Sequence, residues 1–75
     1  MKKFIVKENS SCIFEKNTEA FLVEDYCNPP NFLAGLFSGT YITGEKDMEY
    51  YNLPSNTEIQ LEKVCWFSDF NIIEE

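Results

Sequence analysis

The sequence predicts a mainly β protein: one small domain over residues 1–75, with an antiparallel sheet or half-open barrel of about five short strands. Three observations favour this fold class. Short β-branched or aromatic runs recur along the chain, Pro and Gly interrupt them, and residues 57–67 alternate apolar and polar side chains. A short helical turn or two is also expected, and an α+β fold is the alternative.

The first part of the chain contains three candidate strands. Residues 2–7 hold a short apolar run between lysines, residues 12–15 hold a second run, and residues 19–25 a third. Polar segments at 9–11 and 16–17 are suited to turns between them. We therefore expect a hairpin-like opening half.

The middle of the chain begins with Pro29 and Pro30, which end any strand because they remove two backbone donors and fix φ. Asn31 and Gly39 are suited to the two ends of a short helix, although Gly35 weakens it. Four large apolar residues recur between them at helical spacing: Phe32, Leu33, Leu36 and Phe37. The pattern predicts a short helical turn over residues 31–39.

After this turn the sequence predicts a strand over residues 40–43, between two glycines suited to tight turns. Residues 45–51 are polar and acidic and are expected to form a loop or a single helical turn. Residues 57–67 predict a long strand, because they alternate and contain several β-branched side chains. A helix is the competitor, since Ser55 and Glu58 have the spacing of a capping box. Residues 68–75 either fray or add a short terminal strand.

The composition excludes several function classes. Hydrophobic residues make up 44% of the chain and aromatic residues 16%, too much for a disordered chain. There is no His, so acid–base catalysis by His and metal ligation by His are excluded. There is no Arg, and 13 acidic residues against 6 lysines give a net charge of −7, which opposes direct binding of nucleic acid. We expect no enzyme activity and no metal or organic cofactor.

The three cysteines and the amino-terminal residues bear on localisation. Cys12, Cys27 and Cys65 are odd in number and widely spaced, without a C-x-x-C pair, so we expect reduced thiols and neither a disulfide framework nor a zinc site. The apolar run after Lys3 is too short for an export signal, and no segment is long enough to span a membrane. The expected compartment is the cytoplasm.

Two sets of side chains are candidates for contact with a partner. The acidic set is expected to be either a solvated surface or an acidic binding face: Glu45, Asp47, Glu49, Glu58 and Glu62. The apolar set is expected to divide between the core and an interface: Phe32, Leu33, Leu36, Phe37, Tyr50, Tyr51 and Trp66.

These features predict a small acidic protein-binding or inhibitor module that occupies the basic, nucleic-acid-binding surface of another protein, such as a host or defence enzyme. The Lys/Asn/Ile/Phe-rich, Arg-free composition resembles that of many short proteins of low-GC bacteria and their phages, a resemblance of composition without a residue motif. The alternative is a structural module that forms homo-oligomers through exposed aromatics and strand edges.

Overall fold

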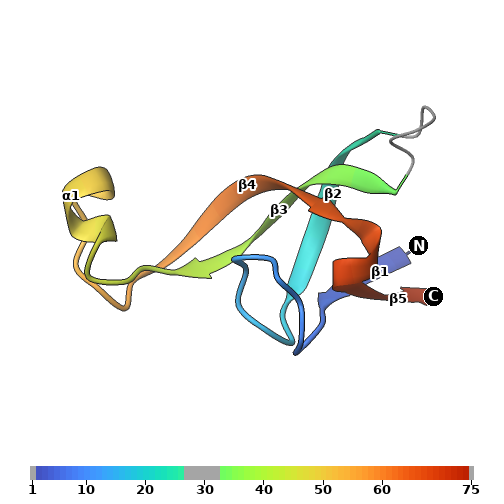
Figure 1. The fold of residues 1–75 in the computed structure, drawn as a ribbon, viewed down its shortest axis with the longest axis horizontal. Coiled ribbons are helices and arrows are strands. Elements are labelled where there is room, and N and C mark those ends of the chain that lie inside the picture. Colours follow the sequence, from blue (N-terminus) through green and yellow to red (C-terminus); the bar gives the residue numbers. More distant parts are fainter. Residues whose placement is uncertain (1, 27–32, 75) are drawn as a thin grey trace.

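The structure, a computed structural model, describes residues 2–26 and 33–74 and confirms the mainly β prediction (Figure 1). The described strands form one antiparallel sheet in the order β4-β3-β2-β1-β5. The strands are β1 (Lys2–Val6), β2 (Glu19–Asp25), β3 (Ala34–Ile42), β4 (Glu58–Trp66) and β5 (Phe70–Glu74). A short helix, α1 (Asp47–Tyr51), connects β3 to β4, and a 3-10 turn, η1 (Phe67–Asp69), connects β4 to β5.

The sheet curls because its two edge strands are consecutive in the chain. β4 and β5 lie at opposite ends of the strand order, yet only the three residues of η1 separate them. Backbone hydrogen bonds hold this connection in place: Phe67 N–H donates to Leu33 O at 2.7 Å, and Lys7 N–H donates to Asp69 O at 2.9 Å. The result is a curled five-stranded antiparallel sheet, one of the two forms that the sequence predicts (Figure 1).

The core is a cluster of phenylalanines inside the curl. Phe37 of β3 is fully buried, and its ring packs against Phe70 with 4.2 Å between centroids and edge-on against Phe4 at 5.3 Å. The Phe4–Phe37 pair has the T-shaped arrangement that aromatic rings favour, and the Phe37–Phe70 pair is tilted by 34°. Val6, Phe14, Ala20 and Cys65 complete the cluster.

Gly39 is required by a close approach, not by its backbone angles. A Cβ at this position would lie 2.6 Å from Cγ of Phe14, whose side chain is buried. Phe14 comes from the loop of residues 7–18, between β1 and β2. The absence of a side chain at Gly39 therefore lets this loop seal one side of the core against β3.

Two element predictions are wrong. Residues 34–42 form β3, not part of a helical turn over 31–39; the chain there pairs with β2 on one side and β4 on the other. Its side chains alternate in burial, and the helical spacing of the apolar residues is coincidental, because two ladders of backbone hydrogen bonds override a weak local preference. Residues 31 and 32 lie outside the described residues.

The second wrong prediction is the strand over residues 12–15. That segment is a bent loop, because both edges of β1 are already occupied, by β2 and by β5. The strands predicted over 2–7, 19–25 and 57–67 are confirmed. Of the alternatives left open, residues 45–51 contain a helical turn and not only a loop, and residues 70–74 form a terminal strand and do not fray. The strand predicted over 40–43 is the end of β3.

The far end of the β3–β4 hairpin carries α1 and lies well away from β1 and β5 (Figure 1). We call residues 43–57 the hairpin tip. Among the described residues, no helix is both long and apolar enough to cross a membrane.

Candidate functional site

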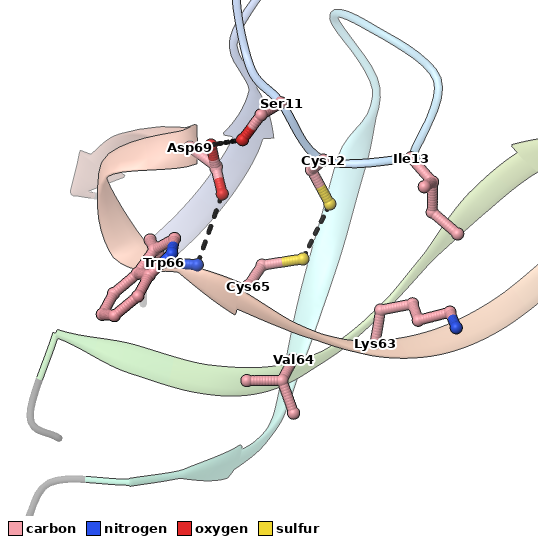
Figure 2. Close-up of a pocket in the computed structure, with 8 residues that line it drawn as sticks. All are labelled: Ser11, Cys12, Ile13, Lys63, Val64, Cys65, Trp66 and Asp69. Atoms are coloured by element: carbon pink, nitrogen blue, oxygen red, sulfur yellow. Dashed lines mark hydrogen bonds between the residues drawn. The ribbon is translucent and has the colours of Figure 1, made fainter.

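The outer side of β4 carries a row of exposed side chains at alternate positions. In β4 the odd-numbered Cys65 belongs to the core, so the even-numbered residues point away from it. The row begins with carboxylates near the hairpin tip and ends with apolar groups near η1: Glu58, Gln60, Glu62, Val64 and Trp66, all of them exposed. Figure 2 shows Val64 and Cys65 on opposite sides of the strand.

Cross-strand neighbours extend this row over β3 and β2. Val64 lies opposite Leu36, and Leu36 lies opposite Glu24 of β2. Residues directly opposite each other in an antiparallel sheet share a face. We call this surface the outer face, and it consists of Phe21, Glu24, Leu36, Glu58, Gln60, Glu62, Val64 and Trp66.

Exposure on the outer face is unusually high for its large apolar groups. Val64 is 60% exposed, Trp66 is 58% exposed, and Phe21 is 56% exposed. Acidic side chains stand beside them, since Glu62 precedes Val64 on the row and Glu24 flanks Leu36. An aromatic and aliphatic centre with a charged rim is the composition typical of a protein interface.

Gln60 is held down on the outer face by β3. Its amide Nε2 donates to Thr40 Oγ1 at 3.3 Å, and its Oε1 accepts a hydrogen bond from Ser38 Oγ at 3.3 Å. Because Gln60 is engaged with the sheet, the two flanking carboxylates of Glu58 and Glu62 are the charged groups that project from the row.

A pocket of about 280 Å³ opens at the apolar end of the row, between the loop of residues 7–18 and β4 (Figure 2). Asp69 lies on one side of the pocket and connects β4 to the loop. Its carboxylate accepts hydrogen bonds from the backbone N–H of Trp66 at 3.3 Å and from Ser11 Oγ at 3.5 Å. The lining residues are Ser11, Cys12, Ile13, Lys63, Val64, Cys65, Trp66 and Asp69.

Two cysteines meet inside this pocket. The Sγ atoms of Cys12 and Cys65 lie 2.7 Å apart, although the residues are 53 positions apart in the chain. Burial, followed by the hydrogen bond with Cys12, raises the pKa of the Cys65 thiol far above its ordinary value, so Cys65 is protonated at neutral pH. Both are free thiols, as expected from the sequence, and Cys27 lies outside the described residues.

The remaining acidic candidates lie in the hairpin tip, which precedes β4, and are not part of the row on that strand. Asp47 is engaged locally, because its Oδ2 accepts hydrogen bonds from Tyr41 Oη and from Gly44 N–H, each at 2.7 Å. The Tyr41 hydroxyl, with the Gly44 amide second, lowers the pKa of Asp47. Glu45 and Glu49 are exposed, so they remain available for contact.

The apolar candidates divide between core and surface, as the sequence predicts for residues 32–37. Phe37 is fully buried, Leu36 is half-buried on the outer face, and Leu33 is exposed; Phe32 lies outside the described residues. Tyr50 and Tyr51 are exposed on α1, whereas Trp66 is the last residue of β4, at the end of that strand away from the hairpin tip.

Sequence reasoning missed Phe21, Glu24 and Val64 as members of the outer face. The register that brings them together contains a bulge between Leu22 and Glu24, where one residue of β2 has no partner on β3. Alternation within β2 gave a signal that Phe21 and Leu22 face opposite sides, but the sequence does not indicate which side faces the core.

No group of three or more Cys, Asp or Glu side chains within residues 2–26 and 33–74 is arranged to hold a metal ion. Comparison of the chain with protein-family models, with curated proteins and with solved structures finds no match.

Proposed function

We propose that this chain is a small acidic protein-binding module, and that its outer face docks on a basic surface of another protein. The observation that supports this most directly is the row on β4, where projecting carboxylates and exposed apolar groups lie on one strand and one face.

The apolar end of the row is suited to supply binding energy. Trp66 and Val64 are more than half exposed, and Phe21 lies on the same face. Trp is the residue type most enriched among side chains that dominate interface energetics. Burying these groups against a partner removes apolar surface from water, at about 25 cal/mol per Å².

The acidic end and the net charge of −7 set the chemistry of the partner. Glu58 and Glu62 project from positions four residues apart in a strand, a separation of roughly 13 Å. A partner surface rich in Lys and Arg complements them and is drawn in by long-range attraction. Proteins that bind nucleic-acid backbones carry such surfaces, so we assign the partner to this class.

The test is affinity capture from a bacterial lysate at low salt, with bound proteins eluted by rising salt and identified. The informative variant is Glu58→Gln with Glu62→Gln, which keeps the shape of the row and removes two charges. Its matched control is Glu45→Gln with Glu49→Gln, which removes two charges at the hairpin tip and leaves the outer face intact. We expect the first variant to lose its partner at lower salt and the control to retain it.

Equal loss of binding in both variants would show that net charge alone matters, and would overturn the assignment of the outer face. Added DNA should displace the partner, because it competes for the same basic surface. Size-exclusion chromatography with light scattering distinguishes the assembly alternative: a stable homo-oligomer that dissociates on Trp66→Ala would replace the proposal.

A further inference from the structure

We propose that Cys12 and Cys65 form a thiol–disulfide exchange site, at which a low-molecular-weight disulfide oxidises the two thiols to an intramolecular disulfide. This proposal does not depend on the proposed function. It would covalently link the loop of residues 7–18 to β4 inside the pocket (Figure 2).

The sulfur atoms of Cys12 and Cys65 lie in close contact. Their separation of 2.7 Å is shorter than the roughly 3.5–4 Å at which uncharged heavy atoms normally pack. A disulfide bond is about 2.05 Å long, so bond formation requires the sulfur atoms to approach by well under 1 Å. The two side chains therefore already point at one another in the reduced protein (Figure 2).

Hydrogen bonds within the loop of residues 7–18 hold Cys12 in place. Lys16 Nζ donates to Ser10 O at 2.7 Å and to Cys12 O at 3.1 Å, and Cys12 N–H donates to Ser10 Oγ at 2.9 Å. Phe14 anchors the same loop in the core. Cys65 is fixed on the other side by its position in β4, opposite Gly35. Closure of the disulfide therefore requires little movement of the backbone.

A small molecule that enters the pocket can reach Cys12 more easily than Cys65. Cys12 is half-buried and lines the pocket, whereas Cys65 is buried. A small disulfide such as oxidised glutathione therefore meets Cys12 first. The Cys12 thiolate attacks one sulfur of that disulfide, forms a mixed disulfide and releases one glutathione thiolate.

The second step uses Cys65. Its thiol loses a proton and attacks the Cys12 sulfur of the mixed disulfide, and the second glutathione thiolate leaves. In sum, two protein thiols and one oxidised glutathione give one protein disulfide and two reduced glutathiones. Two electrons and two protons pass from the protein to the small disulfide. Because burial raises the pKa of Cys65, this step should accelerate as the pH rises.

The experiment uses the full chain with Cys27→Ser, so that Cys12 and Cys65 are the only thiols. The protein is incubated with oxidised glutathione, remaining thiols are alkylated, and intact masses are measured with non-reducing electrophoresis alongside. We expect a monomer that loses both thiols together and carries no glutathione. We also expect its melting temperature to rise by roughly 10 °C or more, because the new bond closes a long loop, and to fall again on reduction.

Single variants supply the control. In the Cys27→Ser background, Cys65→Ser should stop at the mixed disulfide on Cys12, because the resolving thiol is absent. Cys12→Ser should remain largely unmodified, because its remaining thiol is buried. The proposal is overturned if the two-thiol protein retains both thiols, accumulates the glutathione adduct, or forms disulfide-linked dimers.

Discussion

The two ends of the β3–β4 hairpin are stabilised in different ways. One end of the hairpin packs inside the curl of the sheet, around Phe37, and we call it the barrel end. The buried groups there are aromatic rings and aliphatic side chains, with Phe37 fully buried among three other phenylalanine rings. At the hairpin tip, α1 buries no residue at all. The one fully buried side chain of the tip is polar, Thr43.

Thr43 organises the tip through hydrogen bonds. Its hydroxyl donates to Pro54 O at 2.8 Å and accepts from Thr57 N–H at 2.8 Å. Its backbone N–H donates to Thr57 O at 2.9 Å, and its carbonyl accepts from Asn56 N–H at 2.7 Å. A chain of this size builds one core, so a hairpin that projects from it is held by specific polar contacts.

The largest expected effect comes from the barrel end. Phe37→Ala should lower the free energy of unfolding by about 3–5 kcal/mol, because it leaves a cavity at the centre of the ring cluster. Urea unfolding followed by Trp66 fluorescence measures it, with Phe37→Leu as a milder variant should the first not fold. Tyr50→Ala on α1 is the control, and its effect should stay within about 0.5 kcal/mol, since Tyr50 is 88% exposed. Similar losses of stability in Phe37→Ala and Tyr50→Ala would show that the barrel end and the hairpin tip are not stabilised in different ways.

Two glycine substitutions compare how tightly the barrel end and the hairpin tip are packed. Gly39→Ala should destabilise the protein by about 1–3 kcal/mol, because the new Cβ meets the buried Phe14 ring at 2.6–2.8 Å. Gly44→Ala, at the tip, places its Cβ no nearer than 3.6 Å to Asp47 Oδ2, an ordinary contact. It should be neutral or stabilise the protein by up to about 1 kcal/mol. Thermal melts of both variants test whether tight packing is confined to the barrel end.

Because the Thr43 hydroxyl holds the hairpin tip, Thr43→Val should lower the free energy of unfolding by about 1–3 kcal/mol. This substitution leaves the Thr57 N–H without its side-chain acceptor, and it leaves the Pro54 carbonyl with the Thr57 hydroxyl as its remaining side-chain donor. Thr43→Ser keeps the hydroxyl and should recover most of the loss. Hydrogen exchange of the Thr57 amide is the local readout; unchanged protection in Thr43→Val would show that the hydroxyl does not hold the tip.

The smallest effect concerns pH and should be confined to the tip. The pKa of Asp47 is lowered from its ordinary value of 3.8, because the carboxylate accepts hydrogen bonds from Tyr41 and Gly44. The stability that the ionised Asp47 carboxylate contributes is therefore complete above that ordinary pKa. It is lost as the pH falls through the lower pKa of the folded state. The Gly44 amide resonance should titrate below pH 3.8, and Asp47→Asn should abolish that titration. A midpoint above 3.8 would contradict the assignment.

The sequence predicted the strands whose side chains alternate over many positions, such as β4, because a two-residue period is a local property. It failed for β3, where Gly35 and Gly39 interrupt the apolar pattern. At both positions, side chains or backbone of other segments fill the space that a Cβ would occupy. A sequence records the glycine but not the neighbour that requires it.

The candidate site was predictable in part for the same reason. Glu58 and Glu62 fall on one face because they share a strand, whereas Phe21 and Glu24 join them only through the bulged register of β2 on β3. The pairing of Cys12 with Cys65 spans 53 positions and follows from the curl of the sheet, which no local pattern encodes.

The pairing of β1 with β5 also sets the order of events during synthesis. Lys2 pairs with Glu74, so β1 leaves the ribosome well before its partner β5 and must wait for it. Until residues 70–74 emerge, one edge of β1 and the adjoining side of Phe4 stay open to solvent and to other chains. Contacts between residues so distant in sequence also form slowly, because a long loop must close before they are made. We therefore expect the nascent chain to become resistant to proteolysis only once β5 has docked on β1.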